Sequence, residues 1–132
     1  MEPARLESLP LFAELDDEER AEVAERVHEK TVEPGTTLTT HGDNAYELFV
    51  IEEGEAEVRR GEEVIRSLRQ GDSFGEIGLL ATGTRTATIV ATTPMRLIVL
   101  FSREFKRIED RMPSIAHSLR EAMRERVART SF

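Results

Sequence analysis

Residues 71–88 read Gly71-Asp72-Ser73-Phe74-Gly75-Glu76-Ile77-Gly78-Leu79-Leu80-Ala81-Thr82-Gly83-Thr84-Arg85-Thr86-Ala87-Thr88. Unlike a strand with one buried face, this segment does not alternate between apolar and polar residues. Gly75 and Gly78 let a backbone approach a ligand closely and direct its N–H groups at an anion. Arg85 adds a planar guanidinium suited to two phosphate oxygens, whereas the Glu76 carboxylate accepts hydrogen bonds such as those of a sugar hydroxyl. The segment therefore has the chemistry of a nucleotide site.

The sequence on both sides of this segment is typical of short β-strands. Between Thr31 and Phe101, apolar stretches are separated by glycines that mark turns. Residues 46–50 and 55–59 alternate in side-chain character, which predicts strands with one buried face each. A hairpin turn is expected at Arg60-Gly61-Glu62 before a strand over 64–68, and further strands are expected over 86–91 and 95–101. Together these segments indicate a compact β-sandwich or barrel.

Helices are predicted at both ends of the chain. Residues 16–29 have acidic side chains in their first turn and a small apolar face, and the preceding Leu11, Phe12 and Leu15 are expected to anchor them to the core. Ser102 is the expected N-cap of a second helix, and Pro113 ends that helix and begins a third. The apolar faces of these two helices are Phe105, Ile108 and Met112, and then Ile115, Leu119, Met123 and Val127.

The composition favours one domain over residues 1–132, with a helical part over 1–29, a β part over 30–101 and two helices over 102–132. No apolar run approaches the roughly 20 residues that cross a bilayer, and no secretory signal is recognisable, so a cytoplasmic location is expected. The absence of cysteine excludes disulfides, thiolate nucleophiles and cysteine-ligated metals. A net charge of −8 argues against direct binding of nucleic acid.

Residues 71–88 resemble the phosphate-binding cassette of cyclic nucleotide-binding domains, the family of bacterial catabolite activators, kinase regulatory subunits and cyclic-nucleotide-gated channels. That cassette reads F-G-E-[LI]-[AG]-L-[LM], followed after a few residues by R-[AST]-A-[TS]. Residues 74–80 and 85–88 match it at eleven ordered positions. The resemblance extends from Leu9 to the helix at Pro113. It implies a mainly β fold, an eight-stranded antiparallel, jelly-roll-like β-roll with an N-terminal helix and two C-terminal helices.

The resemblance also assigns ligand-binding residues by position. Glu76 would accept a hydrogen bond from the ribose 2′-hydroxyl, while Arg85, Thr86 and the backbone around Gly75 would hold the cyclic phosphate. For the large apolar residues nearby, packing in the core is the competing interpretation. The full set of expected ligand contacts is Phe74, Gly75, Glu76, Ile77, Gly78, Leu79, Arg85, Thr86 and Ala87.

In such domains the last helix often closes over the base as a lid. Leu119, Met123 and Arg126 lie on the helix face that would do so. The tail resembles that of bacterial channel domains, in which an arginine near the position of Arg126 stacks on the purine. Two other interpretations stay open for Leu119 and Met123, a dimer seam and ordinary core packing. For Arg126, the alternative is a solvated charge.

The resemblance implies a non-catalytic sensor module that binds a 3′,5′-cyclic purine nucleotide and signals through its C-terminal helices. Thr86 is compatible with either nucleotide, and the Arg-rich, Lys-poor composition is typical of bacterial proteins, which favours cAMP over cGMP. An interaction module of the same fold without a ligand is the alternative. An enzyme, a catalytic residue, a cofactor and a metal site are not expected, because no nucleophile–base pair and no histidine–carboxylate triad is recognisable.

The expected partners are the cyclic nucleotide and an effector, either a separate protein or a fused domain outside this sequence. The chain is expected to be a monomer or a weak dimer that associates through the C-terminal helix.

Overall fold

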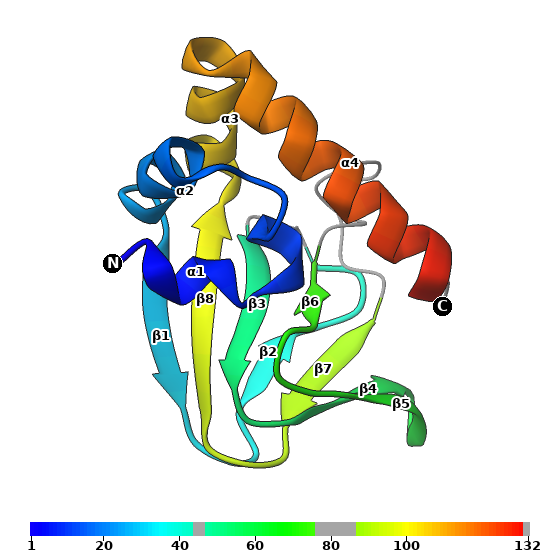
Figure 1. The fold of residues 1–132 in the computed structure, drawn as a ribbon. Coiled ribbons are helices and arrows are strands. Elements are labelled where there is room, and N and C mark those ends of the chain that lie inside the picture. The colour runs from blue at the N-terminus through cyan, green and yellow to red at the C-terminus, as the bar shows by residue number, and fades with distance from the viewer. Residues whose placement is uncertain (44–46, 76–86, 131–132) are drawn as a thin grey trace.

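The computed structural model describes residues 1–43, 47–75 and 87–130, with the side chains of these residues up to Glu125 (Figure 1). Its strands form two antiparallel four-stranded sheets. Sheet A has the order β1 (His28–Val32), β8 (Met95–Phe101), β3 (Glu47–Glu53) and β6 (Ser73–Phe74). Sheet B has the order β2 (Thr37–Thr39), β7 (Thr88–Ala91), β4 (Ala56–Arg60) and β5 (Glu63–Leu68). These eight strands and the flanking helices confirm the expected β-roll.

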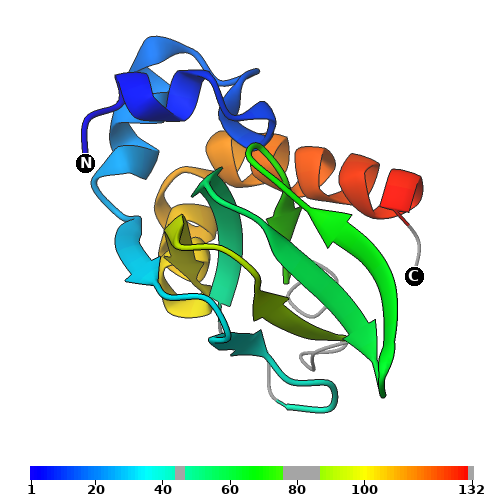
Figure 2. The ribbon, with the colours of Figure 1, turned by 90° about the horizontal axis from the view of Figure 1, so that it is seen from below.

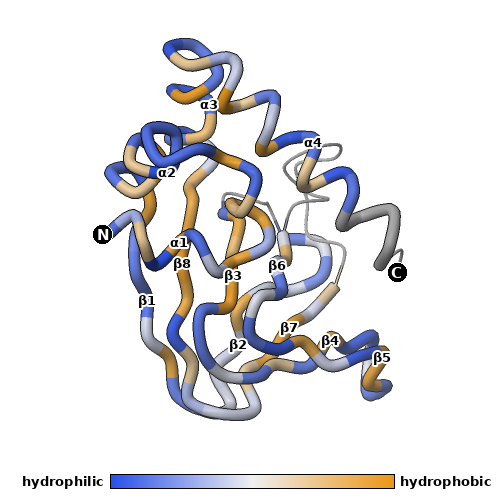
Figure 3. The backbone as a smooth tube through the Cα atoms, viewed as in Figure 1, coloured by the Kyte–Doolittle hydropathy of each residue, from blue (hydrophilic) through white to orange (hydrophobic). Residues whose placement is uncertain are grey.

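Apolar side chains pack on both faces of sheet A. From β3, Phe49 and Ile51 face sheet B and pack in one cluster with Val58. Leu48 and Val50 lie on the opposite face and pack in a second cluster under the helices. Figure 3 shows apolar residues concentrated along β3 and β8. The expectation of one buried face is therefore wrong for β3, because this strand lies in the middle layer of a three-layer structure.

Helices cover the outer face of sheet A (Figure 2). They are α1 (Ala4–Glu7), the 3-10 helix η1 (Pro10–Phe12) and α2 (Asp17–Ala24) from the N-terminus, and α3 (Ser102–Arg111) and α4 (Pro113–Thr130) from the C-terminus. Leu11, Phe12 and Leu15 are buried in this layer, which confirms that they anchor the N-terminal part to the core. Within the described ranges, no helix is both long and apolar enough to cross a membrane.

The helix expected over 16–29 is shorter than predicted, with eight residues over Asp17–Ala24. Asp16 caps α2, since its carboxylate accepts from the Glu19 amide at 2.8 Å and the Glu19 side chain accepts from the Asp16 amide at 3.0 Å. The helix ends at Ala24, and β1 begins at His28, opposite Val99 of β8. β1 is an edge strand with a mostly exposed, polar sequence, so it lacks the apolar alternation that identifies a strand. The strand conformation of β1 therefore depends on its pairing with β8.

The C-terminal helices follow the expected arrangement with one difference. Phe101 is the N-cap of α3, and Ser102 is the first helical residue. The expected cap at Ser102 is therefore wrong, because β8 continues directly into the helix. α4 begins at Pro113 as predicted, and an ion pair between Arg120 and Glu109 joins it to α3. The predicted hairpin turn after Arg60 is confirmed between β4 and β5.

Candidate functional site

The first end of the candidate segment is anchored in sheet A. β6 pairs with β3, with Phe74 opposite Phe49 and Ser73 opposite Val50. The rings of Phe74 and Phe49 stack at a centroid distance of 4.9 Å and an interplanar angle of 15°. Phe74 is 3% exposed, and its side chain belongs to the cluster between the sheets. Gly75 follows with a φ of +93°, at the point where the chain leaves the sheet.

The second end of the segment is anchored in sheet B. Ala87 is 4% exposed and lies in the same cluster as Phe74. The hydroxyl of Thr39 donates to the Ala87 carbonyl at 2.9 Å. The backbone amide of His41 donates to the Thr88 hydroxyl at 3.1 Å. Residues 76–86 therefore connect two buried, well-tied points, one in each sheet.

Six of the predicted ligand contacts lie outside the described residues, and their roles stay predictions: Glu76, Ile77, Gly78, Leu79, Arg85 and Thr86. The structure places the other three, Phe74, Gly75 and Ala87, at the two ends of the segment. The side chain of Phe74 packs in the core. Core packing was the alternative to a ligand contact for the large apolar residues. Any contact of these three with a ligand is still a prediction.

The predicted lid residues belong to the helical layer. Leu119 and Met123 are fully buried and pack in one cluster with Leu9 and Phe12 of the N-terminal part. Core packing, one of the interpretations left open, thus describes both side chains in this structure, and a role over the base stays a prediction. Arg126 lies in α4, and its side chain is outside the described part.

The N-terminal part packs against α4, a contact that the sequence interpretation did not predict. Leu6, Leu9 and Phe12 are spaced by three residues, as expected for one helical face, and all three are buried. This spacing was the feature of the sequence that could have predicted a buried helical face. It was weak because α1 and η1 are short and are separated by Ser8 and Leu9, so no amphipathic helix of ordinary length is visible.

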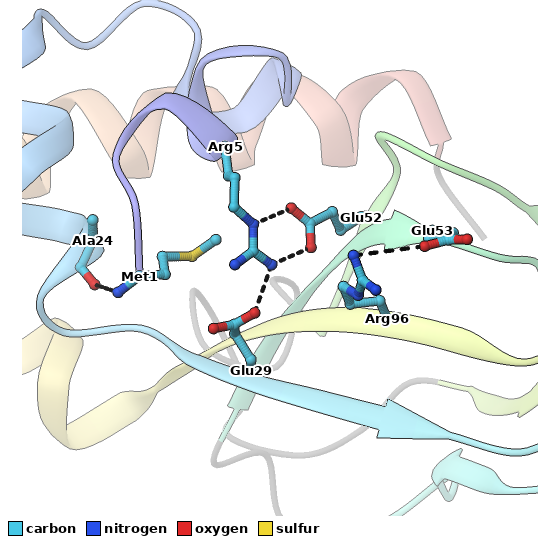
Figure 4. Close-up of polar contacts among 7 residues, drawn as sticks. All are labelled: Met1, Arg5, Ala24, Glu29, Glu52, Glu53 and Arg96. Atoms are coloured by element: carbon cyan, nitrogen blue, oxygen red, sulfur yellow. Dashed lines mark hydrogen bonds and ion pairs between the residues drawn. The ribbon is translucent and has the colours of Figure 1, made fainter.

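A charged network ties the N-terminal part to sheet A (Figure 4). Arg5 donates from Nε and Nη2 to the two carboxylate oxygens of Glu52, at 2.9 and 2.5 Å. Its Nη2 also donates to Glu29 Oε1 at 2.5 Å. The N-terminal amine of Met1 donates to the Ala24 carbonyl at 3.1 Å. One guanidinium therefore links α1 to both β1 and β3.

Arg5 and Glu29 shift each other's pKa values. The hydrogen bond from Arg5 lowers the pKa of the Glu29 carboxyl, and the charges of the N-terminal amine and Arg96 act in the same direction. The hydrogen bonds to Glu52 and Glu29 raise the pKa of Arg5 above its ordinary value. A lowered carboxyl pKa stabilises the folded chain above the unfolded-state pKa, and this contribution is lost as the pH falls through the folded-state pKa.

We expect Arg5→Met to destabilise the domain at neutral pH and to have a smaller effect in acid. The difference in the free energy of unfolding between wild type and variant should shrink as the pH falls from about 4.5, the ordinary carboxyl pKa, through the lower pKa of Glu29 in the folded domain. Denaturant unfolding of both proteins at neutral pH and at about pH 3.5 measures this difference. Arg107→Met is the matched control, because Arg107 is exposed and pairs with Glu104 inside α3. An equal difference at both pH values would contradict the assignment.

Within the ranges that the structure describes, no three His, Asp or Glu side chains gather in a way that would hold a metal ion. The expectation that the domain works without metal or cofactor stays a prediction.

A comparison with models of protein families shows the family to which this chain belongs. A model of the family described as cyclic nucleotide-binding domain matches residues 29–111, more than half of the chain. The chain belongs to the cyclic nucleotide-binding domain family. The match includes all eight strands and α3 except for His28 of β1, and it confirms the resemblance inferred from residues 74–88.

Relatives of this cyclic nucleotide-binding domain include regulatory proteins. The cAMP-dependent protein kinase regulatory subunit of Yarrowia lipolytica is 37% identical over 105 residues, which cover 78% of this chain and 28% of that protein. The chain spans about a quarter of the length of the curated relatives it matches first. These relatives are fungal, and the bacterial origin inferred from composition stays a prediction.

Solved structures share the fold. The N-terminal domain of a transcriptional regulator from Streptomyces coelicolor is 31% identical, with a TM-score of 0.80 over 95% of this chain and 91% of that one. The regulatory subunit of a cAMP-independent protein kinase A from Trypanosoma brucei is 22% identical, with a TM-score of 0.83 over 95% of this chain and 44% of that one, and shows the fold alone.

Proposed function

We propose that this domain is a non-catalytic sensor that binds a 3′,5′-cyclic purine nucleotide, with cAMP preferred over cGMP. The observation that carries the proposal is the cassette sequence, in which Glu76 and Arg85 stand at the family's positions. The ends of the segment support it, because Phe74 and Ala87 are both buried between the sheets. The eleven residues 76–86 connect these two anchors and contain both Glu76 and Arg85.

The chemistry of the segment fits the two charged features of such a ligand. The cyclic phosphate carries one negative charge on two exocyclic oxygens, and the Arg85 guanidinium can donate to both of them. Backbone amides near Gly75 and Gly78 add donors to the same group. Glu76 repels phosphate but accepts from a ribose hydroxyl. The carboxylate therefore orients the nucleotide, and the guanidinium supplies most of the charge-dependent affinity.

The fold by itself does not determine the ligand, because the similar Trypanosoma brucei protein is described as belonging to a cAMP-independent kinase. Conversely, the Yarrowia lipolytica relative is named a cAMP-dependent regulatory subunit. We infer a cAMP site here from that more similar relative together with Glu76 and Arg85. An interaction module without a ligand is the alternative of the same fold.

Calorimetric titration of one protein sample with cAMP and with cGMP tests the proposal. We expect one site per chain, with micromolar or tighter affinity for cAMP and weaker affinity for cGMP. Tighter binding of cGMP would reverse the preference. No heat with either nucleotide would overturn the sensor proposal and favour the interaction module.

We propose that the ligand signals through α4. Leu119 and Met123 hold this helix against the N-terminal part, so a displacement of α4 changes the packing around Phe12. A ligand shifts this equilibrium only by the difference of its affinities for the two helix arrangements. The partner that detects the shift is an effector, as a separate protein or a fused domain.

We expect Arg126→Ala to weaken cAMP binding by about three- to tenfold, because the guanidinium loses its stacking contact with the purine. Calorimetry measures the change. Arg124→Ala is the matched control on the same helix, because Arg124 is exposed and pairs with Glu121 at 2.9 Å. Equal affinities of Arg126→Ala and wild type would overturn the lid role of this residue.

A further inference from the structure

We propose that Thr39 and Thr88 are positioning residues for the nucleotide site, with Thr39 as the main one. Their hydroxyls hold the start of β7 at the point where the chain carrying Arg85 and Thr86 joins the β-roll. The inference rests on the proposed function and assigns a role to residues outside the cassette contacts.

The bond of Thr39 connects the end of the cassette to a different strand. Thr39 is 6% exposed, and its hydroxyl donates to the Ala87 carbonyl at 2.9 Å across 48 positions of sequence. Thr39 lies at the end of β2, and Ala87 immediately precedes β7. Because the bond is buried, water competes with it less than at the surface, and the loss of the donor leaves a buried carbonyl without this partner.

The two ends of β7 are held in different ways. At the end away from the cassette, the backbone of Ala91 accepts from the Gly35 amide at 2.8 Å and donates to the Thr36 carbonyl at 2.9 Å. At the cassette end, the register with β2 shifts between Thr37 and Thr39. There the backbone pairing with β4 reaches Thr88, opposite Arg59, and Ala87 beyond it is held by the Thr39 hydroxyl, while the Thr88 hydroxyl accepts from the His41 amide. Side-chain substitutions can therefore loosen this end selectively.

Loosening this end acts on the phosphate contact through the covalent chain. Arg85 is two residues before Ala87, so its Cα lies within about 7 Å of the fixed point. A binding group keeps its full effect only when the surrounding structure holds it within about 0.5 Å of the productive position. Thr39→Val keeps the shape of the side chain and removes the donor. The guanidinium then spends more time away from the phosphate.

A set of single and double variants titrated with cAMP tests this role. Thr39→Val should bind about tenfold more weakly than wild type, and Thr88→Val about threefold more weakly. Thr39→Ser keeps the hydroxyl and should bind within about twofold of wild type. Thr37→Val is the matched control, because Thr37 is exposed on the same strand. Thermal unfolding and circular dichroism of every variant establish that the fold is kept.

A double-mutant cycle separates positioning of Arg85 from a general effect on structure. If Thr39 acts through Arg85, Thr39→Val should weaken binding by less than about twofold when Arg85 is already alanine. A full tenfold effect in that background would overturn the proposal, as would wild-type affinity of Thr39→Val. Should Thr39→Val not fold, unchanged binding by Thr88→Val would overturn it. Absence of cAMP binding by wild type contradicts the proposed function instead, so the two failures are distinguishable.

Discussion

Arg85→Ala is expected to weaken cAMP binding by about 2–4 kcal/mol, one of the two largest effects that we predict. The variant leaves the cyclic phosphate without its charged partner, while the backbone amides of the cassette remain. Since desolvation of the phosphate is then poorly compensated, the loss exceeds that of an ordinary neutral hydrogen bond. Calorimetric titration over a wide range of ligand concentration measures it.

Two further variants show whether charge or geometry accounts for that loss. Arg85→Lys keeps the charge but replaces the planar fork by a single ammonium group, so we expect an affinity between those of wild type and Arg85→Ala. Arg107→Ala is the control for a changed net charge, because Arg107 is exposed on α3. A loss below about 1 kcal/mol for Arg85→Ala would exclude Arg85 as the phosphate ligand.

Gly54→Ala is expected to lower the free energy of unfolding by about 3 kcal/mol. Gly54 lies between β3 and β4 with a φ of +104°, a conformation that side chains rarely adopt. A Cβ at this position would lie 2.5 Å from the Pro94 carbonyl oxygen and 2.9 Å from Met95 Cα. Both atoms are backbone, so relief requires movement of the turn between β7 and β8.

The position of that turn is tightly held, which is why the clash is costly. The Glu55 amide donates to the Thr93 hydroxyl at 2.9 Å, and the Thr92 amide donates to the Glu55 carbonyl at 3.0 Å. Gly61→Ala is the matched control, since its φ is +61° and nothing lies within 4 Å of its Cβ position. In that variant the free energy of unfolding should fall by only about 1 kcal/mol, because only the backbone conformation is strained. Denaturant unfolding compares the two, and equal losses would contradict the steric argument.

Most of the fold was predictable because its signals are local. The turn at Gly61, the helix start at Pro113 and the apolar face of α3 depend on residues close together in sequence. The cassette is also a local pattern, and the family match over residues 29–111 confirms what it implied. For the candidate site, sequence spacing was sufficient to choose Glu76 and Arg85 as the charged residues of the proposal.

The remaining features depend on contacts between distant segments. Thr39 pairs with Ala87, and Arg5 with Glu52, at separations of 48 and 47 positions. No local pattern indicates either contact. Leu119 shows the same limit, because its helical spacing identified an apolar face but not the layer against which that face packs.

By itself, the sequence determined the family, the alternation of strands and turns and the chemistry of residues 74–88. Only the tertiary structure decided that His28 begins a strand, that both faces of β3 are buried and that the Thr39 hydroxyl bonds to the Ala87 carbonyl. The physical reason is that turns, caps and side-chain chemistry are properties of short segments. Burial and cross-strand bonds are properties of the surfaces that fold against those segments.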